Sequence, residues 1–114
     1  MNEAVTVSVA RTPIGRAFRG AFNNVKSPTL AAHAIEHAVR RARIEPAEID
    51  DVVLGTVLGA GTAGMNVARN AALAARLPYS VPAQTIDRQC DYWRVRRKDP
   101  GCVGRRSIHN AFAP

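Results

Sequence analysis

Two segments of this chain carry residue types and spacings that could do chemistry. Cys90 follows a short apolar run at residues 81–86, and residues 59–64 place glycines in the order Gly-x-Gly-x-x-Gly. A cysteine thiolate is a nucleophile, and a glycine-rich turn before a helix can cradle a phosphate. The sequence therefore offers two candidate sites, one for covalent catalysis and one for dinucleotide binding.

The glycine-rich segment has the sequence context of a dinucleotide-binding turn. It follows a predicted strand and opens a predicted helix, and Asp87 ends the next strand, where an acid could bind ribose hydroxyls. Against this, the preceding strand is the second in the chain rather than the first, and Asp87 can pair with its neighbour Arg88. Glycine loops are also common where a helix packs closely on a sheet. A dinucleotide-binding fragment is therefore the least favoured alternative, and it predicts that NAD protects the fold.

Cys90 lies where parallel α/β folds place reactive groups, just beyond the carboxyl end of a predicted strand. A helix starting there would favour the thiolate form. Placement alone nevertheless favours a buried, inert thiol. A disulfide with Cys102 is open, but without an apparent export signal we expect two reduced thiols and a cytoplasmic protein.

Apolar periodicity predicts the elements that must position these residues. Alternating valines indicate the first strand, and the first helix starts with Ser27 as a capping hydroxyl and Pro28 in its first position. The polar face of that helix carries His33 and His37, which we expect to be solvated. The predicted elements are, in order, a strand at residues 3–10, a helix at 28–42, a strand at 52–58, a helix at 65–77 and a strand at 81–86. This strand-helix-strand-helix-strand order predicts an α/β fold with a parallel sheet.

Positive charge is concentrated near the C-terminus. The 114 residues carry a net charge of +7; residues 1–90 hold ten Lys/Arg and seven Asp/Glu, and residues 91–114 hold six and two. The tail also lacks helical or strand periodicity. A small basic module that binds nucleic acid or phosphate ligands is the alternative function, and it predicts salt-dependent binding. Most such tails are merely solvated, so nucleic acid is not the favoured partner, and no apolar run has the length of a membrane-spanning helix.

Three stretches of the chain resemble the thiolase family. Residues 9–15, Val-Ala-Arg-Thr-Pro-Ile-Gly, resemble the opening strand and loop of thiolases. Residues 61–73, with Asn66 and Arg69, resemble their glycine loop and the helix that follows. Residues 85–90, Thr-Ile-Asp-Arg-Gln-Cys, resemble the segment that delivers the nucleophilic cysteine. By this resemblance the glycine-rich loop is a connection in the fold and not a dinucleotide cradle.

The resemblance implies a fold, a reaction and a role for Cys90. Residues 1–90 would be a partial thiolase-like N-terminal domain, and residues 91–114 a basic, irregular tail. Thiolases transfer acyl groups on coenzyme A, so Cys90 would accept the acyl group as a thioester, and its backbone N–H would help to form an oxyanion hole. The resemblance implies acyl-CoA as substrate, no further cofactor, no metal, no membrane, and the homo-oligomeric assembly of family members.

The chain departs from the thiolase pattern directly after Cys90. Thiolases activate this cysteine with a histidine in Gly-His-Pro and use a second cysteine in Cys-x-Gly-Gly-Gly, and this sequence contains neither motif. Cys102 starts like the second motif but continues into arginines. Residues 109–113 match the family's Asn-Glu-Ala-Phe-Ala motif only faintly, and they follow Cys102, whereas the family motif precedes the second cysteine. We therefore expect a truncated thiolase-like acyltransferase that lacks full activity alone, and whether the chain by itself is an enzyme stays open. A frame change would explain the tail, and the DNA beyond codon 90 tests this.

Overall fold

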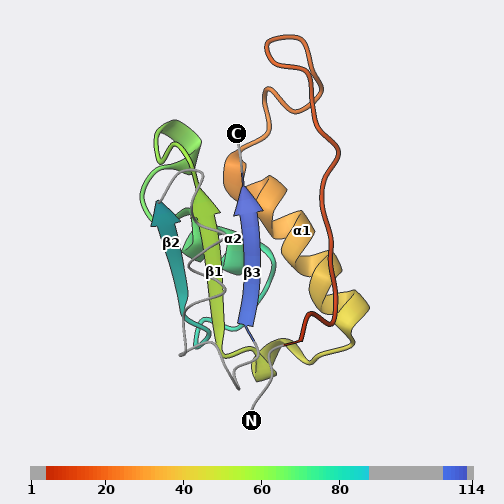
Figure 1. Ribbon diagram of the computed structural model, residues 1–114. Coiled ribbons are helices and arrows are strands. Elements are labelled where there is room, and N and C mark those ends of the chain that lie inside the picture. Colours follow the sequence, from red (N-terminus) through yellow and green to blue (C-terminus); the bar gives the residue numbers. More distant parts are fainter. Residues whose placement is uncertain (1–4, 88–106, 113–114) are drawn as a thin grey trace.

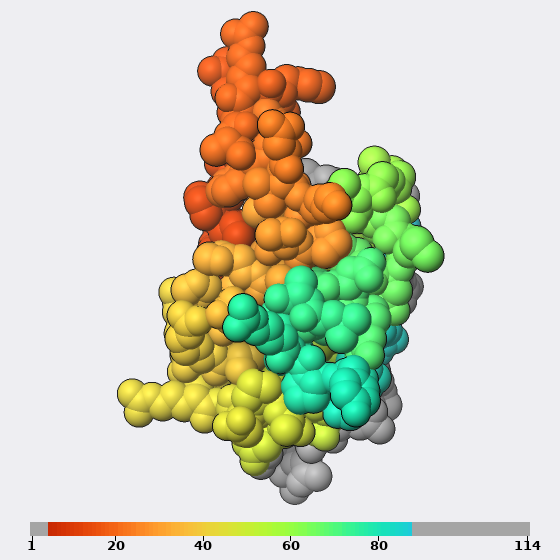
Figure 2. Space-filling model, turned by 180° about the vertical axis from the view of Figure 1, so that it is seen from behind, coloured from red at the N-terminus to blue at the C-terminus, as the bar shows by residue number. Residues whose placement is uncertain are grey.

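The computed structural model describes residues 5–87 and the backbone of residues 107–112. Its helices and strands are α1 (Ser27–Ala42), β1 (Asp51–Thr56), α2 (Val67–Ala74), β2 (Ala83–Asp87) and β3 (Ser107–Phe112), with single 3-10 turns η1 (Pro46–Glu48) and η2 (Gly61–Ala63). The strands form a parallel sheet in the order β2-β1-β3. Both helices lie on one face of this sheet (Figure 1, Figure 2). The predicted α/β class with a parallel sheet is confirmed.

The core lies between β1 and the two helices. Val52 and Leu54 of β1 are fully buried and pack with Ile35 of α1 and with the inner face of α2. That inner face is made of small side chains, namely Ala68, Ala71, Ala72 and Ala75. Because alanine is small, α2 can approach the sheet closely, as its alanine-rich sequence predicts. Met65 begins the predicted helix at 65–77, but α2 starts at Val67, and Met65 precedes it with φ at +57° and is 97% exposed.

The start of α1 differs from the sequence prediction. Ser27 is the first residue of the helix and not its cap; the cap position is Lys26, which makes no side-chain capping bond. The Ser27 hydroxyl lies 2.8 Å from the hydroxyl of Thr62 in the glycine-rich loop. A tertiary partner has thus taken the hydroxyl that local sequence preference assigns to a cap, and the bond ties α1 to that loop.

The strand predicted at residues 3–10 is absent from the described part of that segment, residues 5–10. Val5, Val7 and Val9 are between 67% and 76% exposed. The segment runs beside α1 (Figure 1), where Arg41 donates a hydrogen bond of 2.8 Å to the carbonyl of Val9. Alternating valines form a strand only where they pair along a sheet edge, and this segment lies against α1 instead, while both edges of β1 are taken by β2 and β3.

A strand forms in the tail, where the sequence predicts irregular structure. β3 pairs with β1 in parallel along its whole length, from Asp51 opposite Ser107 to Thr56 opposite Phe112. Parallel pairing uses backbone N–H and C=O groups, so it does not require an alternating apolar pattern in the added strand. The expectation of an irregular tail is therefore wrong for residues 107–112. Within the described ranges, no helix has the length and hydropathy that crossing a bilayer requires.

Candidate functional site

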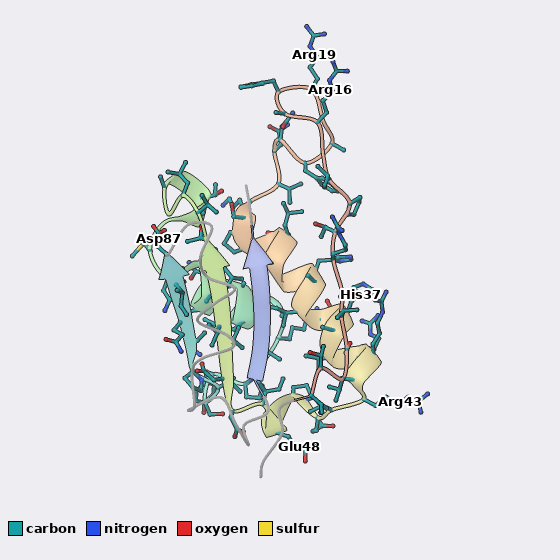
Figure 3. All side chains as sticks on the ribbon, in the orientation of Figure 1. Arg16, Arg19, His37, Arg43, Glu48 and Asp87 are labelled. Carbon is teal, nitrogen blue, oxygen red and sulfur yellow. The ribbon has the colours of Figure 1, made fainter. Side chains whose placement is uncertain are left out.

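The predicted functional segments converge on the carboxyl end of the sheet. Thr56, the last residue of β1, is the register partner of Asp87, the last residue of β2. Partners in adjacent strands point to the same face, which here is the face that Val52 and Leu54 turn toward the helices. The glycine-rich loop reaches this edge, since a Cβ on Gly59 would lie 3.9 Å from a carboxylate oxygen of Asp87. Figure 3 shows Asp87 at the end of β2, next to that loop.

Cys90, the predicted nucleophile, lies outside the described residues, as does Cys102. The last described residue before it is Asp87, three positions earlier in the chain. β2 therefore leads the chain to the carboxyl edge of a parallel sheet, which is where α/β folds place reactive groups. The role of Cys90 stays a prediction.

The glycine-rich loop uses its own backbone donors internally. The N–H of Ala63 donates to the carbonyl of Ala60, and the N–H of Gly64 donates to the carbonyl of Gly61, both at 3.1 Å. These bonds close the turn η2, and Gly61 has φ at +59°, a conformation that glycine adopts without strain. In a dinucleotide site the glycine turn leads directly into a helix, whose free amides face the pyrophosphate. Here the turn closes on itself before α2 begins.

The first amides of α2 are also occupied. The N–H of Ala68 donates to the hydroxyl of Thr85 at 3.1 Å, and the N–H of Arg69 donates to the side-chain carbonyl of Asn66, also at 3.1 Å. A phosphate bound at a helix start needs these donors. The geometry therefore disfavours the dinucleotide interpretation and supports the loop as a connection that positions α2.

Asn66 and Thr85 join the start of α2 to β2. The Thr85 hydroxyl donates to the side-chain carbonyl of Asn66 at 2.8 Å, and the Asn66 amide nitrogen donates to the backbone carbonyl of Ala83 at 3.0 Å. Each side chain thus accepts a hydrogen bond from one amide at the start of α2. Asn66 also bonds to the backbone of β2, and Thr85 is itself a residue of β2. Sequence reasoning placed Asn66 in the loop-helix segment but assigned no role to Thr85. An asparagine just before an alanine-rich run is a helix-cap signal, whereas Thr85 is marked only as the first residue of the segment at 85–90 that carries the resemblance.

Arg69 fastens the connection between α2 and β2. Its guanidinium donates to the carbonyl of Val81 at 2.6 Å and to the carbonyl of Tyr79 at 2.8 Å. Two carbonyls of one short loop are thus held by a single planar group, which restricts how the chain enters β2. Together with Asn66 and Thr85, Arg69 holds the start of β2 in place against α2.

Thr56 is a second residue that sequence reasoning missed. It is 2% exposed, and its hydroxyl has no hydrogen-bond partner among the described residues. A buried hydroxyl without a partner is unfavourable. It lies beside Asp87 on the edge that leads to Cys90.

The two histidines of α1 that the sequence analysis named lie away from this edge, as do two arginines near the N-terminus. His33 and His37 are on α1, and Figure 3 shows His37 on the far side of the molecule from Asp87. Arg16 and Arg19 lie on a projecting loop near the N-terminus. Within residues 5–87, no three His, Cys, Asp or Glu side chains gather as they would around a metal ion.

Comparison with known proteins gives one family. The sequence matches the family model described as thiolase, N-terminal domain, over residues 4–91. It is 46% identical over 89 residues to a 3-ketoacyl-CoA thiolase of Saccharophagus degradans, covering 77% of this chain and 23% of that protein. It is 44% identical over 91 residues to the 3-ketoacyl-CoA thiolase FadA of Escherichia coli K12, covering 79% of this chain and 24% of that protein.

The structure gives the same result. It resembles the crystal structure of the acetyl-CoA acetyltransferase of Bacillus anthracis, with a TM-score of 0.72 and 43% sequence identity. The likeness covers 80% of this chain and 23% of that one. This chain therefore spans about a quarter of the length of the relatives that it matches.

Proposed function

Because the chain belongs to the thiolase family, through the N-terminal domain of that family, we propose that it provides the nucleophile-bearing part of a thiolase-type acyltransferase. The observation that carries the proposal is the family match over residues 4–91, which extends across Cys90. The geometry supports it, because β2 delivers the chain to the carboxyl edge of a parallel sheet three residues before Cys90.

The proposed reaction has two covalent steps. In the first, the Cys90 thiolate attacks the acyl carbonyl of acyl-CoA; a new carbon–sulfur bond forms, the old one breaks, and coenzyme A leaves as a thiolate that takes up a proton. In the second, the carbanion of another acyl-CoA attacks the thioester, a carbon–carbon bond forms, and the Cys90 thiolate is released. The Cys90 backbone N–H would stabilise the oxyanion in both steps.

The proposal divides the catalytic roles: this chain supplies the nucleophile, and residues that this sequence does not contain supply the activating histidine and the second cysteine. The family activates its nucleophile with the histidine of a Gly-His-Pro motif, and none of the three histidines here, His33, His37 and His109, lies in such a motif. The second acyl-CoA must also lose a proton to a base, which in the family is a second cysteine. We therefore propose that this chain lacks full activity unless these groups are supplied, as they are in the longer relatives.

The proposal also covers the cellular location of the chain and its oligomeric state. A cysteine nucleophile requires a reduced thiol, so we propose a cytoplasmic location, where disulfides are rare. We further propose that the active form is oligomeric, as family members are. Titration of free thiols without added reductant checks the reduced state of the cysteines, since it should find both Cys90 and Cys102 free of a disulfide.

Acyl transfer to the cysteine tests the function directly. The chain is incubated with acetyl-CoA, and its peptides are examined by mass spectrometry for the mass of one acetyl group that hydroxylamine removes. We expect the label on the peptide containing Cys90, because the family match extends across this residue. The Cys90→Ser variant should lose the label.

Cys102→Ser is the matched control, since it removes the other thiol and should leave labelling of Cys90 intact. Equal labelling of both cysteines would mean simple thiol exchange with acetyl-CoA and would contradict the proposal. A label that persists in Cys90→Ser would contradict it as well.

A further inference from the structure

The outer face of α1 carries two imidazoles side by side. His33 and His37 are one helical turn apart, and their ring centroids are separated by 4.4 Å with the planes tilted by 55°. His33 is exposed and His37 is half-buried. No hydrogen bond within the described part of the chain uses a ring nitrogen of either residue. Both side chains therefore have ring nitrogens available to a ligand.

The separation of the rings matches that of two imidazoles bound to one ion. Metal–nitrogen bonds of about 2.1 Å and an angle of about 90° at the ion put the two ring centroids about 4.5 Å apart, against about 5 Å for a tetrahedral angle. The observed 4.4 Å brings the two rings close enough for one ion to bind both. A histidine pair at positions i and i+4 on one helix face is also the spacing by which helices present two ligands to a single metal. We propose that His33 and His37 form a two-histidine chelate for a divalent transition metal ion.

The charged groups next to the histidine pair are engaged with other partners. Glu36 is held by Arg40 in an ion pair of 2.7 Å, and Arg41 is directed to the backbone carbonyl of Val9. No third His, Cys, Asp or Glu among residues 5–87 joins the pair, so water would complete the coordination. Cu²⁺ and Ni²⁺ accept two neighbouring imidazoles in their tetragonal geometry, and Cu²⁺ binds more tightly.

The chelate would act on the stability of α1. An ion bridging residues 33 and 37 can bind only when that turn is helical, so binding favours the folded state by mass action. The inner face of α1 packs on the core through Ala31 and Ile35. Metal binding on the outer face would therefore raise the melting temperature of the whole fold. This site is remote from Cys90 chemistry and does not depend on the proposed acyltransferase function.

Titration with Ni²⁺ tests the site. The thiols are first blocked with N-ethylmaleimide so that Cys90 and Cys102 cannot bind the metal, and NiCl₂ is added while thermal unfolding is followed by circular dichroism. We expect the melting temperature to rise with Ni²⁺ concentration and to saturate. His33→Gln and His37→Gln should each weaken Ni²⁺ binding by about tenfold or more, because the second imidazole no longer adds to the first.

His109→Gln is the matched control, because it removes the one histidine outside α1 and should leave the Ni²⁺ effect unchanged. Circular dichroism without metal verifies that each variant retains its helix content. As a second measurement, paramagnetic resonance of bound Cu²⁺ should show two nitrogen ligands in the original chain and one in each single variant. The proposal fails if a single α1 variant binds Ni²⁺ as tightly as the original chain, or if His109→Gln weakens binding as much.

Discussion

Two threonine hydroxyls on neighbouring strands have opposite surroundings. Thr56 in β1 is buried, and its hydroxyl lacks a partner among the described residues, whereas the Thr85 hydroxyl in β2 accepts from Ala68 and donates to Asn66. Burying an unpaired hydroxyl is unfavourable, and leaving its partners unpaired is equally so. Valine has nearly the same shape as threonine without the hydroxyl, so one substitution should have opposite effects at the two positions.

Replacing Thr56 with valine should raise the free energy of unfolding by about 1 kcal/mol, and Thr85→Val should lower it by about 1–2 kcal/mol. Urea denaturation of both variants beside the original chain measures the two changes. Each variant is the control for the other, since both exchange a hydroxyl for a methyl group on adjacent strands of one sheet. A loss of stability in Thr56→Val would show that its hydroxyl has a partner in the folded protein.

At the scale of elements, two segments are suited to the same edge of β1. Residues 5–10 have the alternating valines of a strand but join no strand of the sheet, while β3 occupies the edge of β1 opposite β2. The family match, over residues 4–91, includes the first segment and not the second. β3 therefore adds a strand from outside the region that this chain shares with its relatives.

Deleting residues 107–114 should expose the edge of β1 that β3 now covers. We expect backbone amides of β1 (Asp51–Thr56) to exchange with solvent roughly tenfold faster or more, because one neighbouring strand is lost. Hydrogen exchange followed by mass spectrometry measures this, with the amides of α1 as internal reference. Unchanged exchange in β1 together with new protection at residues 5–10 would contradict the prediction and show that the valine segment has taken the edge.

At the scale of the whole molecule, apolar side chains lie uncovered along the N-terminal segment. Ile14 is 87% exposed and Phe18 is 96% exposed, on a loop that projects from the body of the molecule (Figure 2). The chain also spans only about a quarter of the length of its relatives. Both observations agree with the proposal that activity requires groups outside this chain.

The chain alone should therefore not cleave acetoacetyl-CoA with coenzyme A at a rate above that of its Cys90→Ser variant. The physical reason is that no Gly-His-Pro histidine is available to activate the thiol. Loss of acetoacetyl-CoA absorbance over time measures the reaction. Turnover that disappears in Cys90→Ser would show that residues of this chain suffice, and the proposed division of labour would be wrong.

Much of the fold was predictable from local patterns. The spacing of apolar residues placed α1, β1 and α2 within a few positions of where they lie, and the pattern at 81–86 placed β2. Asn66 and Arg69 were identified only by resemblance, and apart from the local bond from the Arg69 N–H to Asn66, their side-chain hydrogen bonds depend on β2 and its preceding loop. No local pattern reports such partners, because they come from residues 10 or more positions away in the chain.

The sequence by itself determined the helices, the buried strand and the α/β class, because each of these follows from the period with which apolar residues recur. It also determined the family resemblance that ends on Cys90. Only the tertiary structure decided that the valines at 5–9 stay unpaired, that Ser27 bonds Thr62 instead of capping α1, and that residues 107–112 add a strand. These outcomes depend on which sheet edge and which side-chain partner are free once the chain has folded, and that is a property of the packed molecule.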